Sequence, residues 1–183
     1  LCLQPPEDRR AAADSFKLAL QLRPELEIAR RALELYRGLE EAGGQADMLE
    51  LLAELEPEPR EQAGRLFELA GLYLDRFSSS GPARAALERA WRLAPEERTA
   101  QRLESLLVDG HEYGPLAKLQ AERAGRLEGK EAARLWLEAA ENFFLAGAQD
   151  EGRAAIEKAR AEDPQNRSAL LAQLELWARE DKW

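Results

Sequence analysis

The sequence has few of the residues that usually carry chemistry. Its 183 residues include one cysteine, Cys2, and one histidine, His111. A single cysteine forms neither an internal disulfide nor a thiolate metal cluster, and a helical zinc motif needs a second histidine. We therefore interpret His111 as a loop residue, expect no metal and no other cofactor, and expect no catalysis by this chain.

Long apolar runs and basic clusters are also missing. No stretch approaches the roughly 18 apolar residues that a membrane span needs, and none has the three-part pattern of a secretion signal. Acidic and basic residues alternate along a chain of net charge -9, whereas a phosphate backbone binds clustered Lys and Arg. We expect neither membrane insertion nor nucleic-acid binding, and we favour a cytoplasmic location.

Residues that favour helices dominate what is present. Ala, Leu, Glu and Arg are abundant, and the β-branched aliphatic residues are only Ile28, Val108 and Ile156. Apolar residues recur at spacings of three and four, which is typical of amphipathic helices. The pattern predicts about ten helices, over residues 8–22, 26–42, 45–56, 60–77, 82–94, 97–109, 115–128, 131–146, 149–162 and 166–181. The short connections would make successive helices antiparallel.

Proline and glycine divide the chain at regular intervals. Prolines 24, 57, 95 and 164 each close an apolar-periodic segment, which suggests an internal repeat. We interpret Gly43-Gly44 and Gly81-Pro82 as turns, and Asn166 as the N-cap of the last helix. The Glu-rich run over residues 54–61 is interpreted as solvated helix ends and loops.

Two segments share a series of aromatic, small and apolar positions that ends in a proline. In the first, these positions are Phe67, Ala70-Gly71, Leu74, Ala83, Leu87, Ala90 and Pro95. In the second, they are Trp136, Ala139-Ala140, Phe143, Gly152, Ile156, Ala159 and Pro164. Both segments resemble tetratricopeptide repeats, which are helix-turn-helix units of about 34 residues. Small residues at these positions let two helices approach closely, while the aromatic residue fills the remaining groove.

This resemblance implies an all-α fold, a right-handed superhelical solenoid of antiparallel helix pairs. We expect one domain over residues 1–183, cut from a longer bacterial-type array. Its divisions are a partial unit 8–24, units 26–57, 64–97, 97–129 and 133–164, and a partial unit 166–183. Unit 26–57 places its glycines about three residues late, and unit 97–129 lacks a closing proline. Without terminal caps, Leu18, Leu22, Trp177 and Trp183 are expected to be partly exposed and to promote self-association.

The resemblance also implies where a partner would bind. In tetratricopeptide arrays the first helix of each unit lines a concave groove that holds peptide segments. Projected onto the two well-matched units, the groove positions are Arg65, Glu68, Leu72, Asp75 and Arg76, then Arg134, Leu137, Glu141, Phe144 and Leu145. The apolar members, with arginine at their edge, would suit an amphipathic or acidic-tailed segment. An alternative with equal weight is that they pack against a neighbouring helix or another copy of the chain.

The implied function is a non-catalytic scaffold that binds a protein or peptide segment of unknown identity. Two alternatives remain open: a regulatory or substrate-recruiting arm of a larger enzyme or transcription regulator, and a homo-oligomerisation module. The Lys, Asn and Arg clamp of chaperone-binding members is not reproduced, because the corresponding positions hold Glu68, Leu72 and Glu138.

Overall fold

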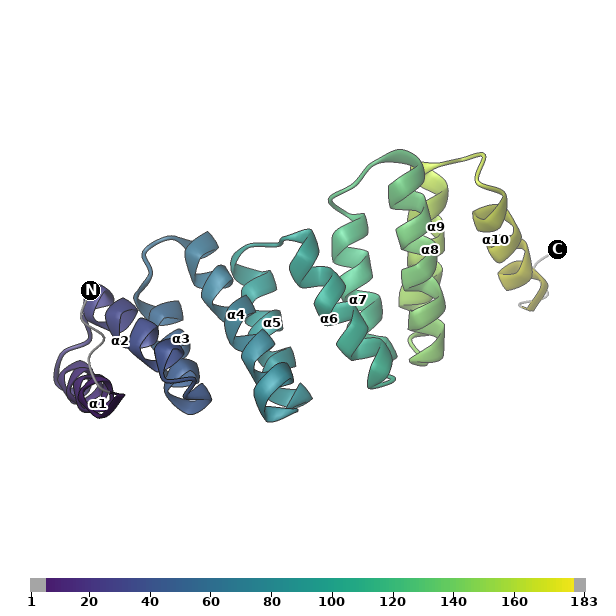
Figure 1. The fold of residues 1–183 in the computed structure, drawn as a ribbon. Coiled ribbons are helices and arrows are strands. Elements are labelled where there is room, and N and C mark those ends of the chain that lie inside the picture. Colours follow the sequence, from purple (N-terminus) through teal and green to yellow (C-terminus); the bar gives the residue numbers. More distant parts are fainter. Residues whose placement is uncertain (1–5, 180–183) are drawn as a thin grey trace. The chain divides into compact units, whose positions relative to one another are not determined.

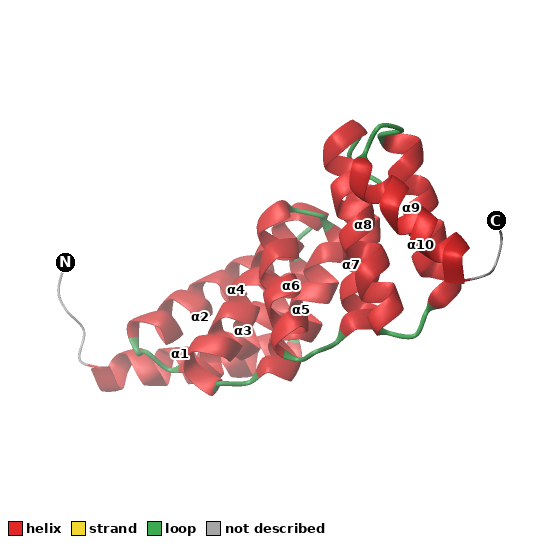
Figure 2. Ribbon diagram, turned by 90° about the vertical axis from the view of Figure 1, so that its right-hand side faces the viewer, coloured by secondary structure: helices red, strands yellow, loops and turns green. Residues whose placement is uncertain are grey.

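The computed structural model describes residues 6–179, and all secondary structure in this range is helical (Figures 1 and 2). The ten helices are α1 (Pro6–Leu22), α2 (Leu26–Gly38), α3 (Ala42–Leu55), α4 (Pro59–Phe77), α5 (Ser80–Leu93), α6 (Glu97–Asp109), α7 (Tyr113–Ala124), α8 (Gly129–Leu145), α9 (Gln149–Glu162) and α10 (Arg167–Arg179). The predicted all-α class and the ten helices are confirmed. Cys2, Trp183 and the side chain of Trp177 lie outside the described residues.

The helices gather into two compact units, Leu1–Leu103 and Glu104–Trp183. In the first unit, each of the helices α1 to α4 packs against the next helix along the chain. In the second unit α7 packs on α8 and α8 on α9, while α10 contacts both α9 and α8. Each unit is thus a series of helices that pack against their neighbours along the chain, so its contacts are local in sequence. The right-handed path of the whole array stays a prediction.

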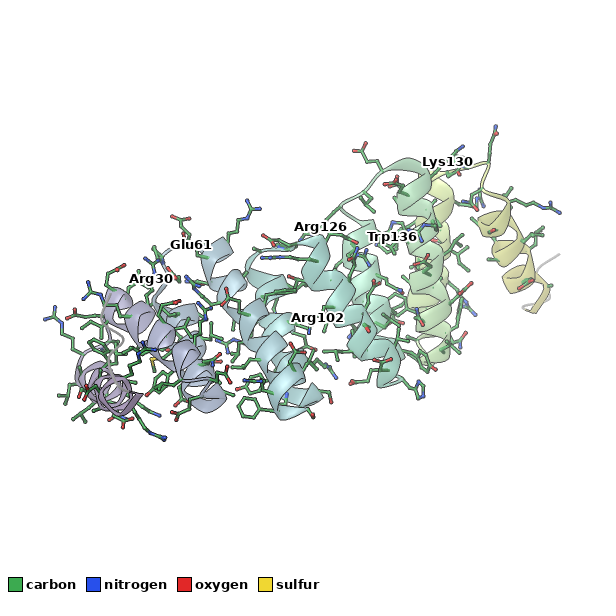
Figure 3. The ribbon with its side chains drawn as sticks, in the orientation of Figure 1. Arg30, Glu61, Arg102, Arg126, Lys130 and Trp136 are labelled. Carbon is green, nitrogen blue, oxygen red and sulfur yellow. The ribbon has the colours of Figure 1, made fainter. Side chains whose placement is uncertain are left out.

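Small residues and two aromatic side chains, Trp136 and Phe143, are buried in the interior of the second unit. Trp136, labelled on α8 in Figure 3, is only 8% exposed. Ala139, Ala140 and Ala159 are buried around it, together with Ile156. These are the signature positions, and their burial follows because alanine lets the α8 and α9 backbones approach closely. In the first unit Phe67 is only half-buried, and the guanidinium of Arg98 lies 4.8 Å from its ring centre.

The connections carry the prolines and one side-chain cap. The prolines at 24, 57, 95 and 164 all lie between helices, where they cannot interrupt a hydrogen-bonded turn. Asn166 precedes α10, and its Oδ1 accepts a hydrogen bond from the backbone N–H of Ala169 at 3.1 Å. The predicted cap is therefore confirmed.

None of the described helices is both long and apolar enough to cross a membrane.

The turn between α2 and α3 differs from the prediction. Helix α2 ends at Gly38, four residues early, and Glu40 adopts a left-handed backbone with φ 54°. Gly43 and Gly44 lie inside α3 and not in the turn. Gly44 is needed for packing, because a Cβ there would overlap the ring of Tyr36 on α2. The interpretation of these glycines as turn residues was wrong.

The same correction applies to Gly81 and Pro82. Both residues lie within the first turn of α5, which begins at Ser80. A proline is tolerated there because the first N–H groups of a helix have no intrahelical acceptor.

Candidate functional site

The first set of predicted groove residues lines a pocket in the first unit, which we call the α4 pocket. Its volume is about 550 Å³. Its lining residues are Arg37, Glu40, Gln45, Leu49, Glu68, Gly71, Leu72, Asp75 and Arg76. Four of the five predicted positions on α4 are therefore brought together, with side chains of α2, α3 and the turn between them.

Two of the three acidic groups of the α4 pocket have arginine partners. Glu68 lies 2.7 Å from a guanidinium nitrogen of Arg37, which also pairs with Glu34. Asp75 lies 3.8 Å from a guanidinium nitrogen of Arg102. Arg37 and Arg76 also line the α4 pocket, so its lining carries charges of both signs.

Arg65, the fifth predicted position, lies elsewhere, in a group that we call the Glu56 cluster: Glu56, Arg30 and Arg65. Glu56 follows α3 and is 1% exposed. Arg30 of α2 approaches one carboxylate oxygen at 2.6 Å, and Arg65 of α4 donates two hydrogen bonds to the other at 3.0 and 3.1 Å. The carboxylate therefore connects the first helices of two successive units (Figure 3 labels Arg30).

The electrostatics of the Glu56 cluster follow from these contacts. Burial acts to raise the pKa of Glu56, but the hydrogen bonds from Arg30 and Arg65 outweigh it and hold that pKa below its ordinary value. Glu56 is thus an ionised, buried group. The interpretation of residues 54–61 as uniformly solvated was wrong at this position, because two arginines from neighbouring helices replace its water.

A second pocket adjoins the Glu56 cluster and was not predicted. Its volume is about 540 Å³, and its lining residues are Phe16, Arg30, Arg31, Leu33, Glu34, Leu35, Arg37, Leu52 and Arg65. One signal in the sequence could have indicated it: Arg30 and Arg37 are seven residues apart, which places them on one face of α2.

The second set of predicted residues lines a pocket in the second unit, which we call the α8–α10 pocket. Its volume is about 480 Å³. The lining residues are Leu137, Ala140, Glu141, Phe144, Leu145, Ile156, Ser168, Ala172 and Glu175. Leu137 and Phe144 are half-buried and pack against the core with one side. They therefore combine the two roles that the sequence left open, core packing and an accessible apolar surface.

The position of Phe144 depends on a glycine of the neighbouring helix. A Cβ at Gly152 of α9 would lie 2.6 Å from Cε1 of the Phe144 ring. Only a residue without a side chain lets the ring lie against α9 at this point. Gly152 thus makes room for the Phe144 ring, which lines the α8–α10 pocket.

Arg134 is the predicted residue that does not reach this pocket. One of its guanidinium nitrogens lies 2.6 Å from a carboxylate oxygen of Glu138, one turn further along α8. The charged residues that line the pocket are Glu141 and Glu175. The arginine edge expected from the sequence is therefore not part of the lining.

The pockets are lined by apolar, polar and charged side chains. Among residues 6–179, no group of three or more His, Cys, Asp and Glu side chains has an arrangement that could hold a metal ion. His111 lies in the turn between α6 and α7, as predicted. Its ring stacks on that of Tyr113, with 6.2 Å between the two ring centres. The pockets offer apolar contacts, hydrogen bonds and charge, which are the means of binding a peptide or protein surface.

Comparisons with known proteins find distant similarity to solved structures. No protein-family model matches the chain, and no curated protein matches it significantly. Among solved structures, a crystal structure of MamA protein is 16% identical, with a TM-score of 0.43 over 85% of this chain and 83% of that chain. A second crystal structure of MamA is 14% identical, with a TM-score of 0.42 over 88% of this chain and 96% of that chain.

Proposed function

We propose that this chain is a tetratricopeptide-type array that acts as a non-catalytic scaffold and holds a segment of a partner protein against α4 and α8. The observation that carries the proposal is where the candidate groove positions lie. Glu68, Leu72 and Arg76 line the α4 pocket, and Leu137, Glu141 and Phe144 line the α8–α10 pocket. Positions chosen from the repeat register alone thus line concave surfaces of both units.

The surface properties of these pockets support protein binding. Each pocket has a volume near 500 Å³, within the roughly 300–1,000 Å³ that is usual for ligand sites. Leu145 is 64% exposed at the edge of the α8–α10 pocket. An accessible leucine beside half-buried Leu137 and Phe144 forms an apolar patch of the kind that binds a partner. The partner side chain would remove this patch from water.

A homo-oligomerisation module is the second candidate function, and one observation favours it. Leu18 and Leu22 of α1 are 62% and 84% exposed. They stand four residues apart and therefore on one helical face. In this alternative the partner is another copy of the chain, and binding would depend on α1.

Quantitative pull-down from an extract of the source organism tests the groove. The variant Leu137→Glu/Phe144→Glu places two carboxylates in the α8–α10 pocket, and Leu72→Glu places one in the α4 pocket. We expect these variants to lose partners that the unmodified chain captures. The matched control is Leu93→Glu/Leu127→Glu, two partly exposed leucines outside both pockets. Unchanged capture by groove variants that keep their helical circular dichroism would contradict the proposal.

A further inference from the structure

The α8–α10 pocket carries negative charge that the lining residues do not balance. Glu141 on α8 and Glu175 on α10 both line it, and both are exposed. No basic side chain is among its described lining residues. The two glutamates therefore stand beside an apolar surface with their charge directed at whatever enters the pocket.

Three basic residues of α8 and α9 are engaged in other contacts. Arg134 pairs with Glu138 on α8. The ammonium of Lys158 on α9 lies 4.2 Å from the ring centre of Trp136, and Arg160 donates a hydrogen bond to the side chain of Gln173. The α4 pocket differs, because Arg37 and Arg76 are among its lining residues. The described lining of the α8–α10 pocket, by contrast, contains acidic and no basic side chains.

The apolar part of the pocket limits the kind of cation that fits. Leu137, Phe144 and Ile156 line it together with two alanines, and Leu145 at its edge is 64% exposed. A small hydrated cation would leave these side chains in contact with water. A segment that carries both large apolar residues and Lys or Arg would cover the apolar surface and neutralise the glutamates at once.

We infer that the α8–α10 pocket binds a basic amphipathic segment of a partner protein. Apolar side chains of that segment lie on Leu137 and Phe144, while its Lys or Arg side chains pair with Glu141 and Glu175. This inference rests on the proposed scaffold function and names the chemistry of the partner. An acidic segment, which the sequence left open, would set its carboxylates beside two glutamates and be repelled. The net charge of -9 would also steer a basic segment toward the chain.

Fluorescence anisotropy with three synthetic helical peptides tests the inference. The first peptide presents Leu and Phe on one face and Lys on the other. The second keeps the apolar face and replaces Lys by Glu, and the third keeps Lys and replaces Leu and Phe by Ser. We expect the unmodified chain to bind the first peptide roughly tenfold more tightly than either of the others, since two exposed ion pairs and the apolar contacts each contribute modestly.

Three double variants separate the effect of local charge from that of net charge. Glu141→Lys/Glu175→Lys should lose roughly tenfold in affinity for the basic peptide and gain affinity for the acidic one. Glu54→Lys/Glu151→Lys makes the same change in net charge at exposed positions outside the pocket and should keep the original preference. Glu141→Gln/Glu175→Gln removes the charge without reversing it and should fall between the two. Circular dichroism checks that each variant is folded.

The outcomes distinguish this inference from the proposed function. A preference of the unmodified chain for the acidic peptide would overturn the inference that the partner is basic. An equal loss of affinity for the basic peptide in the pocket variant and in its control would overturn it as well. If the chain bound the acidic peptide and the variant Leu137→Glu/Phe144→Glu did not, the pocket would still be the binding site, but for an acidic partner. Failure of all three peptides to bind would overturn the inference, and the pull-down then decides the scaffold function separately.

Discussion

Glu56 is a buried residue whose carboxylate is stabilised by Arg30 and Arg65 of the two neighbouring helices. Removing a carboxylate from water is unfavourable, and two guanidinium groups from different helices compensate for that loss. Arg30 and Arg65 remain partly exposed, at 40% and 26% of their side-chain surface. Water therefore screens part of the attraction, and the net stabilisation is smaller than for a fully buried pair.

Truncation of Glu56 should destabilise the fold. We expect Glu56→Ala to lower the free energy of unfolding by about 2 kcal/mol, because it leaves two arginines close together without their anion. Glu54→Ala is the control, since Glu54 is exposed two residues away and should change stability by less than about 0.5 kcal/mol. Urea denaturation followed by circular dichroism measures both. Equal effects of the two substitutions would show that the Glu56 cluster contributes little.

The pH dependence of this contribution has a definite sign. The folded-state pKa of Glu56 lies below its ordinary value of 4.5, so the unfolded chain binds the proton more readily. The contribution of Glu56 to the free energy of unfolding is therefore complete above pH 4.5 and is lost as the pH falls through the folded-state pKa. The stability difference between the unmodified chain and Glu56→Gln should narrow as the pH is lowered from about 6 to about 3. A constant difference across that range would contradict the assignment.

At the scale of the helix, close packing decided where glycine is used. Two glycines stand side by side in α3, and only one is constrained by its surroundings. Gly44 contacts the ring of Tyr36, whereas a Cβ at Gly43 would meet no atom within 4 Å. At Gly44 glycine is required for packing. At Gly43 it only carries the conformational cost that glycine has in a helix.

Alanine substitutions at these two positions should act in opposite directions. Gly44→Ala forces α2 and α3 apart and should lower the free energy of unfolding by about 1–3 kcal/mol. Gly43→Ala should raise it by up to about 1 kcal/mol, because alanine restricts the unfolded chain and suits a helix. Thermal denaturation of both variants provides the measurement. A stabilising Gly44→Ala would mean that the contact with Tyr36 does not constrain the helix pair.

Helix positions were largely predictable from the sequence, and turns were less so. Apolar spacing located all ten helices because a core-facing helix must repeat its apolar residues every three or four positions. The end of α2 was misplaced because Glu40, a residue that seldom adopts positive φ, forms the turn. Glycine is the usual signal for such a turn. Gly44, four residues later, instead lets α3 pack against the Tyr36 ring of α2.

At the scale of the whole molecule, the exposed leucines of α1 bear on assembly. Leu18 and Leu22 were expected to be accessible, and the structure confirms that they are. Burying two such side chains between copies would stabilise an assembly by about 1.5–3 kcal/mol each if burial were complete. Net negative charge opposes association and is screened by salt.

We therefore expect concentration-dependent self-association that increases with ionic strength. Leu18→Glu/Leu22→Glu should reduce it, while Leu93→Glu/Leu127→Glu, with the same change in composition, should not. Sedimentation equilibrium over a range of protein concentrations and at low and high salt provides the test. A monomer at every concentration would exclude association through α1.

The sequence by itself determined the helical class, the approximate positions of the helices and the core positions of the second unit. These follow from local rules, because helix propensity, apolar spacing and small residues at close contacts act within one or two helices. Only the tertiary structure decided which charges are paired. Glu56 became buried between Arg30 and Arg65, and Glu141 came to share a pocket with Glu175. Such pairings join side chains from different helices, and their energies depend on distance and exposure that exist only after the helices have packed.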